Sequence, residues 1–232
     1  LGDALRRQPD FVEALGEDEA LSHEKSRDQL VEEALGNLTW RPSADERRVG
    51  LRRFKRREML RIAARDVLGF ASIEETEREL AGLADACVEA ALRSLGPSFP
   101  FAVIGLGRLG GGELSYASDL DVLFVYDGED AADFRAAEKV AEQLMGELGG
   151  ITPEGRTFRV DPNLRPEGKK GALARSLSGY EAYYERWAQT WEFQALLKAR
   201  PVAGDAAVSE RFAALIKPFV YRDPFPDDDV RE

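Results

Sequence analysis

Two aspartates separated by one residue, Asp119 and Asp121, open the apolar segment 119–126. Alternate residues of a strand share a face, so these carboxylates would lie side by side and oppose each other's ionisation unless a cation lies between them. Mg²⁺ suits such a position because it binds carboxylate oxygens together with water and phosphate. Asp161, at the end of the predicted strand 157–161, would complete the site. The pattern favours metal-dependent phosphoryl transfer over its alternative, a solvated turn.

A cluster of glycines precedes these aspartates, at positions 105, 107, 110, 111 and 112. Glycine has no β-carbon, so backbone amides in such a segment can approach a phosphate group closely. Taken alone, the cluster is equally consistent with a tight turn between buried elements. The acids that follow it favour a segment that contacts nucleotide phosphate.

The same glycines fit the dinucleotide-binding pattern G-x-G-x-x-G over 105–110, and Asp127 follows at about the 20-residue spacing of a ribose-binding acid. An NAD(P)-binding oxidoreductase with a Rossmann fold is therefore an alternative. Parallel strands need a crossover of about a dozen residues or more, whereas only residues 111–118 separate Gly110 from Asp119. This connection is too short for a Rossmann crossover, so we favour the phosphate-contacting segment and keep the oxidoreductase as the alternative.

Hydrophobic periodicity and end signals divide the chain into three segments. Residues 1–95 are predicted to be helical, with capping boxes at Ser43/Glu46 and Ser72/Glu75 opening helices over 43–68 and 72–95. Residues 96–175 contain predicted strands at 99–104, 119–126 and 157–161 and a helix at 133–148, and residues 176–232 contain helices at 180–199 and 205–221. We therefore predict an α+β fold whose small mixed sheet carries the site between helical segments.

Composition restricts the class of protein further. The 232 residues include 32 Lys and Arg against 43 Asp and Glu, and the net charge of −11 argues against a nucleic-acid partner. No apolar run reaches the roughly 18 to 20 residues of a membrane span, and the first residues lack the features of a signal peptide. One cysteine, Cys87, and one histidine, His23, exclude a disulfide framework and a multi-histidine metal site. We expect a globular protein of the reducing cytoplasm.

Three basic side chains are further candidates for the site. Arg165 follows the predicted strand 157–161 between two prolines, where it would bind phosphate bidentately or else pair with a core acid. Lys198 and Arg200, with Glu192, are candidates to face the nucleotide or the aspartates, and the two basic residues could instead pair with the metal-site acids. Lys169 and Lys170 are interpreted as a solvated turn.

Two other patterns are interpreted as structural. On the predicted helix 180–199, one face carries Trp187, Trp191, Gln194 and Lys198, with Tyr184 one turn earlier, and we interpret this aromatic stripe as core. The segment 41–65 is strongly basic but lacks interleaved aromatic residues. We expect it to pack against acidic surfaces of the same protein or of a protein substrate, not against nucleic acid.

The motifs together resemble the nucleotidyltransferase core of the glutamine synthetase adenylyltransferases. The core motif G-x-G-x-x-G-G-x-E-L-x-x-x-S-D-x-D-x-x-F spans 105–124, V-D-x-x-L-R-P-x-G begins at Val160, and W-E-x-x-A-L-x-K-A-R begins at Trp191. The segment from Leu51 to Ala63 also resembles the helix that precedes this core, so the resemblance covers about 51–205. Ala117 departs from the wider polymerase-β-like superfamily, which has glycine there.

The resemblance implies a polymerase-β-like fold and an enzyme that controls AMP on a tyrosine of glutamine synthetase. It implies Asp119, Asp121 and Asp161 as catalytic Mg²⁺ ligands, with Gly107 and Ser118 bordering the phosphates. With the residues above, the candidate nucleotide-binding set is Gly105, Gly107, Gly110, Ser118, Arg165, Lys198 and Arg200.

The family enzyme has one core that removes AMP with inorganic phosphate, releasing ADP, and one that adds AMP from ATP. The segments 110–113, 183–184 and 217–221 favour the removing core. The resemblance also implies signalling-protein regulators of the full-length enzyme. Besides the oxidoreductase, the alternative is a non-catalytic regulatory nucleotide-binding module, against which the intact aspartates argue.

Overall fold

The structure is a computed structural model, and it describes residues 21–152 and 154–221. The predicted helical character of residues 1–20 lies outside the described residues. No helix in the described ranges is long and apolar enough to cross a membrane.

From residue 21 onward, the N-terminal part of the fold contains the helices α4 (Arg27–Thr39), α5 (Ala44–Val67) and α6 (Ile73–Leu95). Both predicted capping boxes are present, because Ser43 and Ser72 each accept a hydrogen bond from the backbone of Glu46 and Glu75, and each glutamate reaches back to its cap. Helix α6 ends at Gly96 in the left-handed conformation, with φ 60°. The predicted helices over 43–68 and 72–95 are confirmed.

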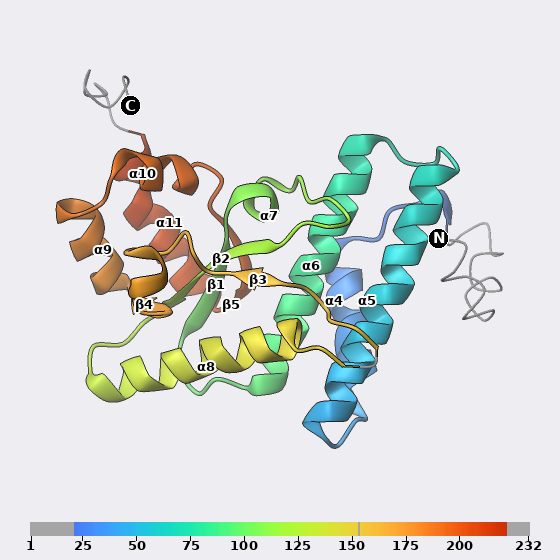
Figure 1. Cartoon of the computed structure of the whole chain (residues 1–232), viewed down its shortest axis with the longest axis horizontal. Helices are drawn as coiled ribbons and strands as arrows, with labels where there is room; N and C mark the ends of the chain where they lie inside the picture. The colour runs from blue at the N-terminus through green and yellow to red at the C-terminus, as the bar shows by residue number, and fades with distance from the viewer. Residues whose placement is uncertain (1–20, 153, 222–232) are drawn as a thin grey trace.

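A mixed five-stranded sheet forms the centre of the molecule (Figure 1). Its strands run in the order β3-β2-β1-β5, and β4 pairs with β2 beside β3; the bounds are β1 (Phe101–Gly105), β2 (Leu120–Tyr126), β3 (Val160–Asp161), β4 (Ala174–Ser176) and β5 (Arg200–Gly204). Strand β1 is antiparallel to β2, whereas β3 and β4 are parallel to it. The antiparallel β1–β2 pair contradicts a Rossmann unit, which needs parallel strands. The predicted α+β fold with a small mixed sheet is confirmed.

Helices cover both faces of this sheet. One core lies between the sheet and the helices α4, α5, α6 and α8 (Ala131–Gly149). From β1 and β2 it contains Phe101, Val103, Val122 and Phe124. A second core contains the alternate strand residues Ala102, Ile104, Leu123 and Val125. It is shared with the helices α9 (Leu177–Arg186), α10 (Thr190–Leu196) and α11 (Ala206–Val220). In Figure 1 the N-terminal helices lie to the right of the sheet and these three lie to its left. The period-2 alternation of β1 and β2 therefore separates two hydrophobic cores.

Several elements differ from the sequence-based expectations. The predicted strand 157–161 is reduced to Val160–Asp161, and β4 and β5 were not predicted. Strand β5 extends the sheet from within the predicted C-terminal segment because it pairs with β1. The glycine cluster contains a single helical turn, α7 (Gly107–Gly111), where we expected only a turn.

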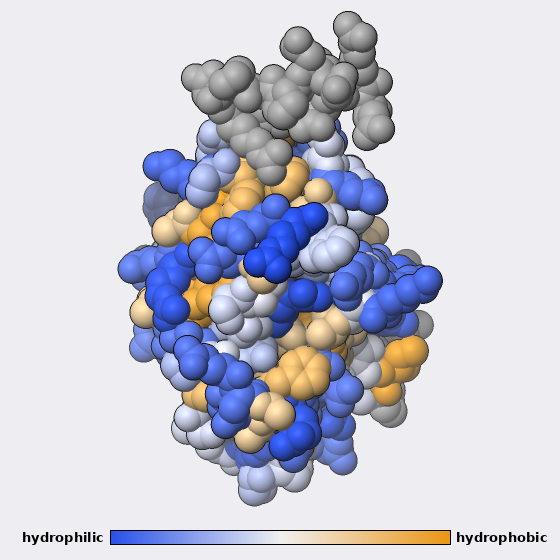
Figure 2. Space-filling view, turned by 90° about the vertical axis from the view of Figure 1, so that its left-hand side faces the viewer, coloured by the Kyte–Doolittle hydropathy of each residue, from blue (hydrophilic) through white to orange (hydrophobic). Residues whose placement is uncertain are grey.

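The predicted helix 180–199 is wrong as one element. Helix α9 ends at Arg186 with Trp187 as its C-cap, and Gln189 is the N-cap of α10, in a capping box completed by Glu192. The break turns the two tryptophans outward, to 73% exposure at Trp187 and 46% at Trp191, whereas Tyr184 is buried as expected. The core interpretation of this stripe is therefore wrong for both tryptophans and also for Gln194 and Lys198, which are exposed. Figure 2 shows the side of the molecule that carries α9 and α10, where polar side chains surround small apolar patches.

The basic residues of α5 pair with acids of this same chain. The buried carboxylate of Glu79, on α6, accepts hydrogen bonds from Nη2 of Arg61 and Nε of Arg65, each at 2.8 Å. The Nε of Arg61 also lies 2.9 Å from the buried carboxylate of Glu58. Farther along α5, Arg48 contacts Glu147 of α8. These contacts confirm that the basic segment packs against acidic surfaces of the same protein.

The substitution Glu79→Ala should lower the free energy of unfolding by about 3–5 kcal/mol, because two buried guanidinium groups lose their partner. The matched control is Glu77→Ala on the same helix, since Glu77 is half-buried and forms no ion pair with the described residues. We expect the control to change stability by no more than about 0.5 kcal/mol. Urea denaturation measures both changes, and equal losses would contradict a structural role of the pair.

Candidate active site

Asp121 and Asp161 are brought together by the parallel pairing of β2 with β3. The two are direct register partners, as are Leu120 and Val160 one residue earlier. Asp119 precedes β2 by one residue, two positions from Asp121, so it shares the face of Asp121. The predicted third carboxylate therefore reaches the edge of the sheet that carries the first two.

Burial and neighbouring negative charge both act on the Asp121 carboxyl. The pKa of the Asp121 carboxyl is raised above its ordinary value, first by partial burial and then by the negative charges of Asp161 and Asp119. Like charges held this close favour a bound cation or a shared proton.

Arg159 supplies positive charge at the same edge and was not predicted. Its Nε lies 3.2 Å from Oδ2 of Asp119, and both side chains are partly exposed. Among residues 21–152 and 154–221, no three Asp, Glu, His or Cys side chains are already arranged as a metal-binding group. The position of Arg159 two residues before Asp161 was the available signal, because that spacing puts both on one face of a strand.

Glycine is required where α7 meets the aspartates. The backbone N–H of Leu106 donates to the carbonyl of Asp121 at 2.8 Å. Gly107 has φ 51°, and a β-carbon there would lie 2.5 Å from Oδ2 of Asp121. A side chain at this position would displace the carboxylate, so the lack of one lets the glycine backbone lie directly against Asp121.

Ser118 and Arg165 stabilise the loops next to the aspartates. The hydroxyl of Ser118 accepts the backbone N–H of Ser115 at 3.1 Å and so closes the turn that leads into Asp119. Arg165 is buried and donates to the carbonyls of Pro162 and Gly171, at 2.9 and 3.1 Å. The expected alternative for Arg165, an ion pair with a core acid, is replaced by these contacts to backbone.

A hollow of about 580 Å³ lies against β3 and the loop after it. Asp161, Arg159, Arg165 and Lys169 are among the residues that line it. Lys169 and Lys170 are exposed, as expected for a solvated turn. The hollow joins one of the candidate metal ligands to three basic side chains, which is suitable for a phosphorylated substrate.

The remaining candidates do not lie at the aspartates. Lys198 pairs with Glu113 at 2.6 Å, and Arg200 forms a bidentate pair with buried Asp85 of α6. Glu192 is buried and accepts a hydrogen bond from the hydroxyl of Tyr183 at 3.0 Å. Contrary to the expectation, it therefore does not face the aspartates. Sequence spacing missed the contact between Arg200 and Asp85 because its partners are 115 residues apart.

The donor set fits Mg²⁺ in its chemistry. Magnesium binds few carboxylates and retains water or phosphate oxygens in its remaining positions. Asp119, Asp121 and Asp161 offer only carboxylate oxygens, and the pKa of Asp121 is raised by burial and then by the negative charges of the other two. Asp119 would have to exchange its contact with Arg159 for the metal.

The sequence of the chain is similar to the sequences of one family of enzymes. Residues 1–215 match the family described as glutamate-ammonia ligase adenylyltransferase. The bifunctional glutamine synthetase adenylyltransferase/adenylyl-removing enzyme of Streptomyces avermitilis is 47% identical over 185 residues, covering 75% of this chain and 18% of that protein. The enzyme of the same name from Leifsonia xyli is 36% identical over 239 residues, covering 100% of this chain and 24% of the relative. The chain thus spans about a fifth of the length of these relatives.

The substitution Gly110→Ala should destabilise the protein by about 1–3 kcal/mol, because overpacking forces the backbone to shift. A β-carbon there would lie 2.0 Å from the carbonyl oxygen of Lys198 and 2.7 Å from that of Gly105. The control Gly146→Ala lies in α8 with nothing within 4 Å, so it should be neutral or stabilise by up to about 1 kcal/mol. Chemical denaturation measures both, and a stabilised Gly110→Ala variant would show that the glycine segment is loosely packed.

Proposed function

Because the chain belongs to the glutamate-ammonia ligase adenylyltransferase family, we propose that it is a nucleotidyltransferase core acting on the AMP group of a tyrosine of glutamine synthetase. The observation that carries this proposal is the register pair of Asp121 and Asp161, with Asp119 on the same face and Gly107 against Asp121. Acids on adjacent strands beside a glycine segment are suited to phosphoryl transfer. Activity of this part alone is included in the proposal, since the relatives are several times longer.

Asp119, Asp121 and Asp161 are the residues that would hold Mg²⁺. Bound there, the metal would neutralise charge on the reacting phosphates and orient them. The proposal is supported by the oxygen-only donor set and by the raised pKa of Asp121. In this scheme the glycines of 105–112 and Ser118 border the nucleotide phosphates.

Removal of AMP is the direction we propose for this core. An oxygen of inorganic phosphate attacks the phosphorus of the tyrosine-bound AMP, the bond from phosphorus to the tyrosine oxygen breaks, and ADP and the free tyrosine leave. Support comes from the sequence segments 110–113 and 217–221. Tyr183 and Tyr184 belong to the buried aromatic cluster, so they support the direction only as sequence markers.

The assignments of ligands and partners complete the proposal. In the proposed direction the second substrate is inorganic phosphate and the nucleotide product is ADP, whereas ATP would serve AMP addition. Signalling proteins regulate the full-length enzyme. The reaction takes place in the cytoplasm, in keeping with the single buried thiol, Cys87.

We expect the chain to release ADP when it is incubated with adenylylated glutamine synthetase, inorganic phosphate and Mg²⁺. A parallel mixture of unmodified glutamine synthetase and labelled ATP tests AMP addition. Chromatography of the nucleotides and label retained on the protein distinguish the two directions. Addition without removal would reverse the proposed direction, and nucleotide binding without either reaction would favour the non-catalytic module.

Variants of the aspartates test the site itself. Asp119→Asn and Asp121→Asn should each lower turnover by about 10²-fold or more while the fold is retained, since charge stabilisation is commonly the largest part of such catalysis. The matched control is Asp127→Asn, because Asp127 lies just beyond the other end of β2 and pairs with Arg211. Activity that survives both site variants would exclude these residues as metal ligands, and loss in the control alone would point back to a ribose-binding acid.

A further inference from the structure

Helix α7 is too short and too rich in glycine to be stable without tertiary contacts. It has five residues, Gly107–Gly111, and its first turn has no side-chain cap. Each glycine costs about 1 kcal/mol relative to alanine in a helix, and a helix this short is unstable alone. The segment that touches Asp121 must therefore be held by contacts from outside.

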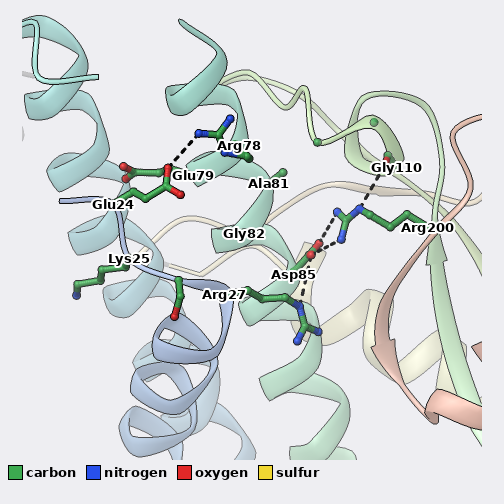
Figure 3. Close-up of a pocket in the computed structure, with 13 residues that line it drawn as sticks. Glu24, Lys25, Arg27, Arg78, Glu79, Ala81, Gly82, Asp85, Gly110 and Arg200 are labelled. Atoms are coloured by element: carbon green, nitrogen blue, oxygen red, sulfur yellow. Dashed lines mark hydrogen bonds and ion pairs between the residues drawn. The ribbon is translucent and has the colours of Figure 1, made fainter. Parts of the chain in front are cut away.

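Arg200 makes those contacts at the carboxyl end of α7. Its Nη2 donates to the carbonyl of Leu109 at 2.9 Å, and its Nε donates to that of Gly110 at 3.3 Å. Arg200 is also the register partner of Gly105, the last residue of β1. Strand β5 therefore brings this guanidinium to the end of the glycine segment, and Figure 3 shows it reaching Gly110.

Asp85 holds Arg200 in this orientation. Its Oδ2 and Oδ1 accept Nη1 and Nη2 of Arg200, at 2.5 and 3.0 Å, in a bidentate pair. Asp85 lies on α6 with 2% exposure, beside a hollow of about 440 Å³ whose wall also includes Gly110 and Arg200. Bidentate pairs fix the plane of the guanidinium as well as its position.

Arg27 contacts the same carboxylate but not α7. Its Nε lies 3.6 Å from Oδ2 of Asp85, and its Nη2 donates to the carbonyl of Val202 at 2.7 Å. In Figure 3 Arg27 and Arg200 approach Asp85 from different sides. The chain therefore contains a natural control, a second arginine on Asp85 that leaves the glycine segment untouched.

We propose that Asp85 and Arg200 are a positioning pair that holds α7 in place, so that Gly107 lies against Asp121 and the glycine segment can receive a nucleotide phosphate. The pair acts through α7 and does not itself reach the aspartates. The nucleotide part of this inference rests on the proposed function. The positional part concerns the protein alone and can be tested without a ligand.

Amide hydrogen exchange of the full chain, followed by NMR, tests the positional part. The reporters are the amides of Gly110, Gly112 and Glu113, which donate to carbonyls of Leu106, Leu109 and Arg108. In Arg200→Gln and Asp85→Asn we expect their exchange to accelerate about tenfold or more, because hydrogen bonds to a charged group are lost. Arg27→Gln should leave these three amides within about twofold of the wild type, because α7 keeps its contacts. Unchanged exchange in Arg200→Gln, or equal acceleration in Arg27→Gln, would overturn the proposal.

A conservative variant covers the case in which Arg200→Gln and Asp85→Asn fail to fold. Arg200→Lys keeps the charge but has no planar fork, so it can pair with Asp85 without bridging two carbonyls. We expect faster exchange at the three reporters with unchanged exchange in the amides of β1 and β2. Protection of the reporters equal to that in the wild type would overturn the proposal.

Calorimetric titration with ADP in the presence of Mg²⁺ measures nucleotide affinity and so tests the nucleotide part of the proposal. The expected result is a dissociation constant about tenfold weaker in Arg200→Lys than in Arg27→Gln, since tenfold corresponds to about 1.4 kcal/mol, within the range of a charged hydrogen bond. Equal affinities in these two variants would overturn the nucleotide part and leave the positional part to the exchange data. Failure of the wild type to bind ADP would instead contradict the proposed function, on which this part depends.

Discussion

The two-residue pairing of β3 with the start of β2 is the constraint on which the candidate site depends. It sets Asp161 beside Asp121, although 39 residues of chain separate these positions. A strand of two residues such as β3 is not stable alone, and neighbouring hydrogen bonds to backbone stabilise it. Leu120 donates to the carbonyl of Arg159 at 2.9 Å, and Arg165 holds the following loop through the carbonyls of Pro162 and Gly171. A small strand pair thus accounts for the accumulation of negative charge at one edge of the sheet.

Ion pairs within the chain connect its N-terminal helices to one another and to α8. Helix α5 is basic, yet its arginines are directed to Glu58 and Glu79 and, at the other end, to Glu147. Burying such pairs contributes little net stability, whereas removing one partner is costly. Their effect is to fix how α5 and α6 pack, and α6 in turn presents Asp85 to Arg200, which contacts the glycine segment. Charge pairing therefore links the N-terminal helices to the sheet that carries the site.

The site could be predicted from sequence where the signals are short in range. The spacing of Asp119 and Asp121 on one strand, the glycines before them and the capping boxes of α5 and α6 all involve residues within a few positions of each other. Such patterns report the local period of a strand or the cap of a helix. The roles of Arg159 and Arg165 and the break at Trp187 were not resolved this way, because they depend on partners in other elements or on competition between two helix ends.

The sequence by itself determined the α+β class, the two long N-terminal helices, the central strands β1 and β2 and the chemical character of the three aspartates. Family membership follows from motifs that are also contiguous in the chain. Only the tertiary structure decided that β5 joins β1, that Arg200 turns away from the aspartates to Asp85 and that α7 is held from its far end. The physical reason is that these contacts join residues about a hundred positions apart, and no local period or spacing specifies which distant partner a side chain will meet.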